Sequence, residues 1–313
     1  MPEWLIERGI GETRAALVDS GRIVEARILC EGVVPAGSIL QAQLKSSGVN
    51  AIAVSGGEEY LLPKGAFGVT EGAKFNIEVT REAIGGAEDW KRPLARATEE
   101  AVRSAPNSIG RELRYPAPAD ELEAAGWSEL LDEARTGLIA FAGGELRVSP
   151  VPAMTLIDVD GQMPPTQLAI AGAKAAAETI RRHSIGGSIG IDLPTVEGKA
   201  ARQAAAMAVD DILPQPFERT AVNGFGFLQI VRLRRHASLF ELASDRATFE
   251  ARALLRRAAR ETGAIQLVGH PAVIAVLEGS SAWVEQLSRQ VGGAVHLRSD
   301  PSLAMSAGHA ERH

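Results

Sequence analysis

The chain has 313 residues, of which 45% are hydrophobic and 23% charged, and its formal net charge is −6; these values are typical of a soluble globular protein with a few modest domains. It contains no apolar run of the ~18 residues that a membrane span requires, and its charged beginning, MPEWLIERG, does not resemble a signal peptide. The single cysteine, Cys30, excludes an intrachain disulfide and a cysteine-rich zinc site. We therefore expect a cytoplasmic protein without membrane contact.

The first third of the chain is predicted to be mostly β-structure. Two β-prone runs, residues 13–19 and 22–29, are joined at Asp19-Ser20-Gly21 and predict a hairpin. After Pro35-Ala36-Gly37 come several short alternating runs separated by glycine-rich turns. Such a series is typical of a small β-barrel of the OB type, and we expect it to occupy residues 36–90.

The middle of the chain alternates between strands and alanine-rich helices. A less regular connection precedes a hairpin that begins near residue 137. Strands alternating with helices indicate an α/β layer with a mixed sheet. The expected strands are 154–160, 187–193 and 220–235, and the expected helices are about 166–183 and 196–212.

The last part predicts a compact α/β unit. A helix over about 245–262 is closed by Gly263 and is followed by strand 264–269, two further helices and strand 294–299. The tail, residues 302–313, has no periodicity, and we expect it to be frayed.

Two predicted strands end on carboxylates, and these are the best candidates for chemistry. In MTLIDVD, the alternation of a strand places Asp158 and Asp160 on one face, about 6.6 Å apart. The second strand ends at Asp192. If the two strands are neighbours, three carboxylates converge at one sheet edge, and oxygen ligands of this kind suit Mg²⁺ or Mn²⁺. The alternative is structural, because an aspartate at a strand end is commonly a turn former or a helix N-cap.

An arginine-rich stretch, residues 228–260, holds eight arginines against three acids. Its helical part carries arginines at i, i+4 and i+8, which favours a solvated helix face for Arg252, Arg256 and Arg260. Two further arginines alternate on a predicted strand, and for them we favour contact with a ligand: Arg232 and Arg234.

Three segments resemble, in order and spacing, the catalytic core of the bacterial ribonuclease E/G family: VPAMTLIDVDG, IRRHSIGGSIGIDL and GFGFLQIVRLRRHASL. The resemblance implies that Asp158 and Asp192 bind the catalytic metal. A metal-supporting asparagine of the family falls on Asp160, which adds negative charge, and the family's R-x-R falls on Arg232 and Arg234. The resemblance also implies hydrolysis that leaves a 5′-phosphate and a 3′-hydroxyl.

The resemblance covers most of the chain and implies a mixed α/β, multidomain architecture. A ribonuclease-H-like subdomain begins at residues 1–35 and is interrupted by an S1-like barrel at 36–90. Its remainder and a connection occupy residues 91–150, with Lys91 near a family lysine that contacts RNA. A DNase-I-like catalytic subdomain at 151–244 and a small C-terminal α/β domain at 245–313 complete the expected organisation.

The chain also departs from the family pattern. The two phenylalanines on which the family's S1 domain stacks bases correspond to Ala53 and Leu61, and Tyr60 beside them is more readily a packing residue. Most of the pocket for a 5′-monophosphate is missing between Lys91 and Gly137, and the cysteine pair of the family's zinc link is absent. We expect a reduced relative that needs no zinc and depends little on the 5′ end. The resemblance leaves open a homodimer.

The sequence therefore predicts a Mg²⁺-dependent endoribonuclease acting on single-stranded RNA, with Asp158, Asp160 and Asp192 at the metal and Arg232, Arg234 and Lys91 on the RNA. Two alternatives stay open. One is a catalytically inactive RNA-binding or scaffold protein of the same fold, and the other is a metal phosphodiesterase that acts on DNA or a small nucleotide.

Overall fold

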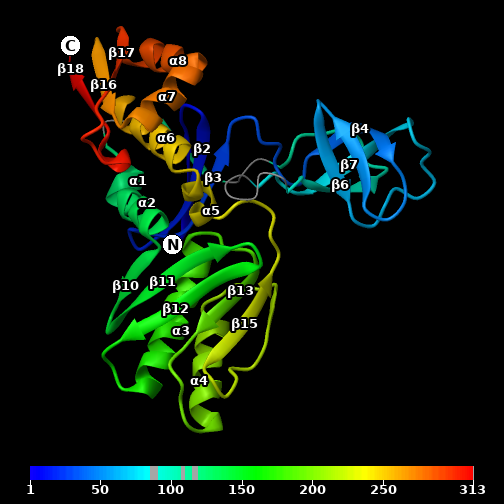
Figure 1. Ribbon diagram of the computed structural model, residues 1–313, viewed down its shortest axis with the longest axis vertical. Coiled ribbons are helices and arrows are strands. Elements are labelled where there is room, and N and C mark those ends of the chain that lie inside the picture. Colours follow the sequence, from blue (N-terminus) through cyan, green and yellow to red (C-terminus); the bar gives the residue numbers. More distant parts are fainter. Residues whose placement is uncertain (85–90, 107–109, 115–118, 313) are drawn as a thin grey trace. The chain divides into compact units, whose positions relative to one another are not determined.

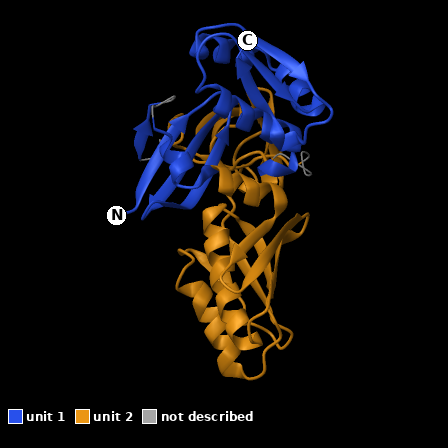
Figure 2. Cartoon of the chain, turned by 90° about the vertical axis from the view of Figure 1, so that its left-hand side faces the viewer, with its two compact units in different colours: residues 1–31, 109–127, 242–313 blue, residues 32–108, 128–241 orange. Residues whose placement is uncertain are grey.

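A computed structural model describes residues 1–84, 91–106, 110–114 and 119–312. Within these residues the protein is mixed α/β, with one closed five-stranded barrel and three further sheets (Figure 1). The predictions of a mixed α/β chain and of a small barrel are thus confirmed. The chain divides into two compact units, residues 1–31, 109–127 and 242–313 and residues 32–108 and 128–241 (Figure 2). In the part of the chain that the structure describes, no helix is both long and apolar enough to cross a membrane.

The first unit contains a four-stranded sheet in which the predicted hairpin lies. Its strand order is β3 (Arg22–Cys30), β2 (Glu12–Asp19), β1 (Glu3–Arg8) and β9 (Arg111–Leu113). Ser20 and Gly21 form the hairpin turn with φ of 51° and 78°, values that glycine adopts readily and that other residues rarely do. The β9 strand pairs with β1 in parallel, so the chain returns to this sheet after the barrel.

The same unit ends in an α/β layer around helix α6 (Arg246–Ala258). Strands β17 (Val295–Ser299), β16 (Ile265–Gly269) and β18 (His309–Arg312) form its sheet, with α7 (Pro271–Gly279), α8 (Ser281–Val291) and the short 3-10 helix η1 (Met305–Ala307). The expectation of a frayed tail is wrong, because β18 pairs antiparallel with β16. Of its four residues only Ala310 packs on the core, so the strand has no alternation that the sequence could reveal.

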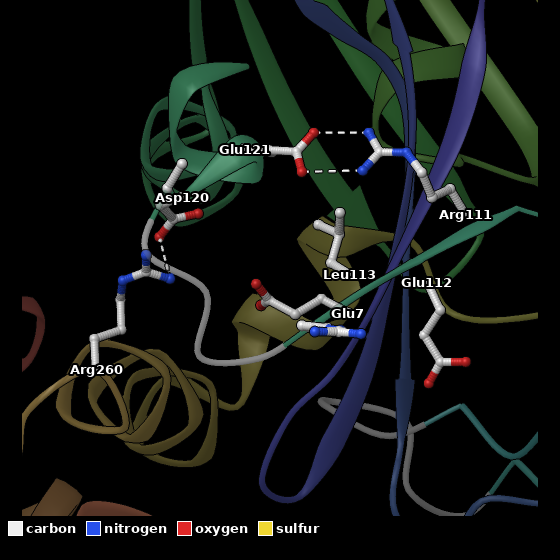
Figure 3. A pocket seen from close by; sticks show the side chains of 9 residues that line it. Glu7, Arg111, Glu112, Leu113, Asp120, Glu121 and Arg260 are labelled. Carbon is white, nitrogen blue, oxygen red and sulfur yellow. Dashed lines mark hydrogen bonds and ion pairs between the residues drawn. The ribbon is translucent and has the colours of Figure 1, made fainter.

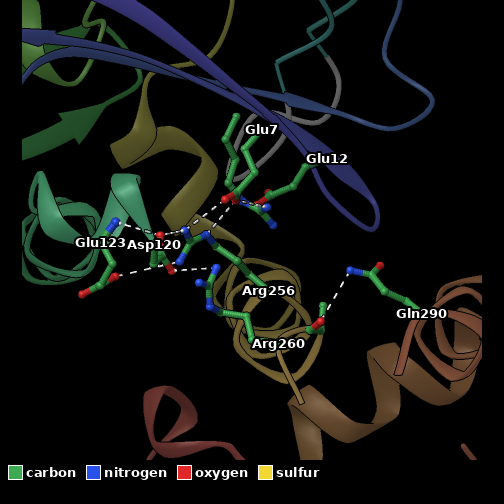
Figure 4. A network of polar contacts seen from close by, with 9 residues as sticks. Glu7, Glu12, Asp120, Glu123, Arg256, Arg260 and Gln290 are labelled. Carbon is green, nitrogen blue, oxygen red and sulfur yellow. Dashed lines mark hydrogen bonds and ion pairs between the residues drawn. The ribbon is translucent and has the colours of Figure 1, made fainter. Parts of the chain in front are cut away.

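Buried charges join three segments of the first unit (Figure 4). The Arg256 guanidinium donates to Glu7 at 2.8 Å and to Asp120 at 2.7 Å, and Arg14 donates to Glu7 at 2.8 Å. Arg256 is only 5% exposed and Glu7 only 3%. The expectation that the arginines of this helix form a solvated face is therefore wrong for Arg256, which holds helix α6 to strand β1 and to Asp120, the N-cap of α1 (Glu121–Ala124).

Asp120 makes the stability of the first unit depend on pH. Burial alone would raise the pKa of the Asp120 carboxyl. Hydrogen bonds from Arg256 and the Glu123 amide, with the charges of Arg256 and Arg260, outweigh burial and hold this pKa below its usual value. A carboxylate with a depressed folded-state pKa stabilises the fold above its unfolded pKa of about 3.9, and the stabilisation disappears as the pH falls through the folded value.

We expect Asp120→Asn to lower the stability of the protein at pH 7 by about 1–3 kcal/mol, because it removes the negative charge that pairs with the guanidinium groups of Arg256 and Arg260. Thermal melting of both proteins between pH 7 and pH 3 measures the effect. The difference in melting temperature should shrink below about pH 4. A difference that is the same at every pH would contradict this role for Asp120.

The barrel consists of β4 (Ile39–Ser46), β5 (Ala51–Ser55), β6 (Glu58–Leu62), β8 (Leu94–Thr98) and β7 (Lys74–Arg81), in that order around it. Its closing strand β8 lies beyond residue 90, where the sequence placed the end of the barrel. Ala53 and Tyr60 are fully buried in the barrel interior. Tyr60 is thus a packing residue, as the sequence favoured, and neither side chain is available to stack on a base.

The second unit also holds a six-stranded mixed sheet. It starts earlier than residue 151, because the hairpin of β10 and β11 belongs to it, and only β12 and β13 pair in parallel. Helix α3 links this parallel pair, and α3 and α4 pack on one face of the sheet (Figure 1). The strand order is β10 (Leu138–Phe141), β11 (Gly144–Val151), β12 (Met154–Gly161), β13 (Gly187–Asp192), β15 (Phe227–Arg232) and β14 (Phe217–Arg219), and the helices are α2 (Trp127–Thr136), α3 (Pro165–Arg182), α4 (Lys199–Asp210) and α5 (Leu239–Ser244).

A glycine sets how closely α3 approaches the sheet. A Cβ atom at Gly172 would lie 2.3 Å from Cγ1 of Val159 on β12, and Val159 is itself buried. Because both neighbours belong to the core, neither can give way without repacking. The pair therefore fixes strand β12 against the helix.

We expect Gly172→Ala to destabilise the protein by about 1–3 kcal/mol through overpacking, although alanine favours helix more than glycine does. Thermal melting tests this, and the double variant with Val159→Ala should recover part of the loss. The control is Gly279→Ala, since a Cβ there meets nothing within 4 Å. Equal melting temperatures for Gly172→Ala and the wild type would show that the contact does not constrain the sheet.

Candidate metal centre

The pairing of β12 with β13 brings the two principal aspartates side by side. The strands are parallel, and Asp158 stands in register with Asp192; neighbouring strands lie about 4.8 Å apart. The preceding residues in both strands, Ile157 and Ile191, are fully buried under the helices. Since strand side chains alternate, both aspartates lie on the opposite face of the sheet, where both are exposed.

Two neighbouring positions complete the polar group. Asp160 lies two residues beyond Asp158 on β12 and is exposed on the same face. Across the sheet, Arg147 on β11 stands in register with Asp158, and Glu145 with Asp160. The open face thus carries three aspartates, with a fourth carboxylate and one arginine on the adjoining strand.

The electrostatics indicate that the aspartates interact. The pKa of the Asp158 carboxyl is raised above its usual value, first by partial burial and then by the negative charges of Asp160 and Asp192. The Val159 amide and the Arg147 charge offset only part of this. A carboxylate with two negative charges close to it marks a position at which a cation is stabilised.

The carboxylates suit a cation that keeps most of its water ligands better than a cation that is enclosed by protein ligands. Among the residues that the structure describes, no three His, Cys, Asp or Glu side chains are arranged to hold a metal ion by themselves. Mg²⁺ usually keeps several waters and binds through one or two carboxylates, so Asp158 and Asp192 are sufficient for it. A structural zinc ion would require four enclosing ligands, usually Cys or His.

The loop that precedes β15 supports the end of β13. The Leu193 amide donates to the Gly226 carbonyl at 3.2 Å. Gly226 has a φ of +94°, and a Cβ there would lie 2.1 Å from the Leu193 carbonyl oxygen, so only glycine fits. Asn223 Oδ1 accepts hydrogen bonds from the amides of Phe225 and Phe227, at 2.9 and 3.0 Å. This turn therefore holds the backbone immediately after Asp192.

The structure does not bring the predicted arginines to the carboxylates. Arg232 is in register with Gly187, at the other end of β13 from Asp192. It lies two residues after the buried Ile230 and therefore on the same, helix-covered face of the sheet. Its Nη1 donates to the Ile185 carbonyl at 3.3 Å. Arg234 follows the strand and forms an ion pair with Glu241. Lys91 belongs to the barrel part of the chain, in the segment before β8.

Sequence reasoning missed Arg147 and the two phenylalanines near Asp192. The alternation in GELRV places Glu145 and Arg147 on one face of the predicted hairpin, but nothing in the sequence gives the register of that hairpin against β12. Phe227 stands in register with Asp192, and Phe225 precedes it in the turn. Both lie within a segment that the sequence predicted to be a continuous strand from 220 to 235.

A second polar hollow, in the first unit, is compensated internally (Figure 3). Arg111 donates to Glu121 at 2.7 Å, and Arg260 lies 3.2 Å from Asp120. The hydrogen bonds that Arg111 donates to the Glu121 and Glu3 carboxylates raise the pKa of Arg111, so these groups stabilise each other as a structural network.

Comparison of the chain with models of known protein families and with curated proteins gives no match.

We expect Asp192→Asn to abolish any stabilisation of the protein by Mg²⁺. A ligand that binds only the native state raises the free energy of unfolding, and this gain disappears when the ligand no longer binds. Without Mg²⁺ the variant should melt no lower than the wild type, since one repulsive charge near Asp158 is gone. Melting curves in MgCl₂ and in EDTA measure both effects, and Asp211→Asn, at an exposed position after α4, is the control. A variant that retains the Mg²⁺-dependent rise would show that Asp192 holds no cation.

Proposed function

We propose that the protein is a Mg²⁺-dependent endoribonuclease that hydrolyses phosphodiester bonds in single-stranded RNA. The observation that carries the proposal is the parallel register of Asp158 with Asp192 on the open face of the sheet. Strand-end carboxylates of this kind are typical of sites in which a divalent ion meets a phosphate. The ordered resemblance of the three core segments to ribonuclease E/G supports the same chemistry.

The fold supports an assignment of the parts within this proposal. The six-stranded sheet corresponds to a DNase-I-like catalytic subdomain, and the five-stranded barrel to an S1-like domain. The sheet formed by β1–β3 and β9 corresponds to a ribonuclease-H-like subdomain interrupted by the barrel, since β9 returns to β1 after it. The residues from α6 to β18 form the small C-terminal domain.

In the proposed site, Asp158 and Asp192 hold the cation, and Asp160 orients its water shell. A bound divalent ion supplies Lewis acidity, which lowers the pKa of a water and offsets charge on the scissile phosphate. Arg147, in register with Asp158, is the guanidinium placed to attract that phosphate. We assign this contact to Arg147 in place of Arg232, which lies at the other end of β13, and Arg234, which follows it.

The proposal is tested with a labelled single-stranded RNA incubated with the full chain in MgCl₂ or EDTA. We expect cleavage in MgCl₂ that leaves 5′-phosphate ends, and a loss of more than about 100-fold in Asp158→Asn and Asp192→Asn. Asp211→Asn should cleave at the wild-type rate. Rates are compared at a temperature at which thermal melting shows every variant to be folded.

The same experiment separates the rivals. Binding of RNA without cleavage under any Mg²⁺ or Mn²⁺ concentration would identify an inactive RNA-binding protein. Equal digestion of a DNA oligomer with the same sequence would identify a general phosphodiesterase. Cleavage that persists in both aspartate variants would contradict the assignment of the site.

A further inference from the structure

An apolar floor lies beside the aspartates on the open face of the sheet. Phe227 stands in register with Asp192 on the neighbouring strand. A Cβ atom at Gly190 would lie 2.6 Å from Cζ of Phe227 and 3.1 Å from Cδ2 of Leu156. The Phe227 ring and the Leu156 side chain therefore extend over Gly190, and the missing side chain of this glycine gives them room. These two side chains form a small apolar surface next to the carboxylates, and Gln229, in register with Gly190, borders it.

A second aromatic side chain, that of Phe225, is carried by the turn that leads into Phe227. It is 84% exposed, yet its backbone is held at three points. Its amide donates to Asn223 Oδ1 at 2.9 Å, its carbonyl accepts from Thr195 Oγ1 at 3.2 Å, and the following Gly226 fits closely against Leu193. The loop is thus anchored by backbone contacts, and the phenyl ring itself is left in solvent on a well-supported turn.

The ring lies within reach of the carboxylates. Phe225 is two residues from Phe227, and consecutive Cα atoms are 3.8 Å apart. Because opposite Cα atoms of an antiparallel pair lie about 4.5–5.5 Å apart, the Cα atoms of Phe225 and Asp192 are separated by roughly 13 Å at most. A nucleotide adjoining a phosphate held at Asp192 can therefore place its base against the ring.

We propose that Phe225, with Phe227 and Leu156 as its floor, stacks a nucleobase of the RNA next to the phosphate bound at Asp158 and Asp192; this inference rests on the proposed function. Aromatic side chains stack on any base, with about 1–3 kcal/mol per base. An uncharged ring is also a contact that does not add to the repulsion between RNA and the acidic cluster. The site takes single strands, because the base faces of a duplex are already stacked.

The primary test is cleavage of a single-stranded RNA by Phe225→Ala and Phe225→Trp. A loss of 1–3 kcal/mol corresponds to a reduction of about 5- to 150-fold in kcat/KM, and tryptophan should restore most of it. Phe225→Leu, which is apolar but not aromatic, should stay as impaired as Phe225→Ala. The control is Met207→Ala, which removes another exposed apolar side chain of the same unit.

A matched set of RNA oligomers, each with one abasic nucleotide, distinguishes stacking from a general effect on the fold. At one position near the cleaved bond, the wild type should lose the same factor as Phe225→Ala does on intact RNA. At that position Phe225→Ala should lose nothing more, because the two changes remove the same contact. Losses that multiply at every position would overturn the stacking assignment.

Binding measurements keep this inference separable from the proposed function. If the wild type does not cleave RNA, the nuclease proposal fails, and fluorescence anisotropy of the same oligomers in MgCl₂ still tests the aromatic site. Weaker binding by Phe225→Ala with recovery by Phe225→Trp would support stacking, whereas equal binding by all variants would overturn it. A change in oligomeric state of Phe225→Ala in gel filtration, without a change in RNA binding, would assign the face to a second copy of the chain and would also overturn it.

Discussion

The proposed site depends on one constraint, the parallel, in-register pairing of β12 with β13. Two fully buried isoleucines, Ile157 and Ile191, fix which face of each strand enters the core. A slip of one residue in either strand would turn its aspartate into the core. The apolar packing against α3, including the contact of Val159 with Gly172, therefore decides that Asp158 and Asp192 meet on the open face. Their mutual repulsion is a consequence of the core.

Two arginines of the arginine-rich stretch are used for structure. Arg256 is buried between Glu7 and Asp120, and Arg234 is paired with Glu241. Part of the positive charge of the arginine-rich stretch is thus neutralised within the fold. Around the aspartates the arginine in register is Arg147, while the adjoining surface is aromatic and aliphatic. The proposed site thus combines a cluster of carboxylates with an adjoining uncharged surface.

The sequence predicted those features that local patterns determine. Alternation identified the strands that end at Asp158 and Asp192, and the alanine-rich runs identified α3 and α4. The sequence could not show that these two strands pair, because their register depends on packing against residues that are distant in the chain. For the same reason Arg147 was missed, and Arg232 was placed on a strand without its face or its distance from Asp192. The terminal strand β18 was missed because only Ala310 among its residues packs on the core, which leaves no alternating pattern.

In the proposed site, Asp158 and Asp192 share one divalent cation. The most direct measurement is a crystal structure of the full chain grown with MnCl₂, in which anomalous scattering locates manganese independently of the protein atoms. We expect an anomalous peak between the carboxylates of these two residues, within direct coordination distance of an oxygen atom of each. A site without such a peak at saturating Mn²⁺, or manganese bound only elsewhere on the chain, would contradict it.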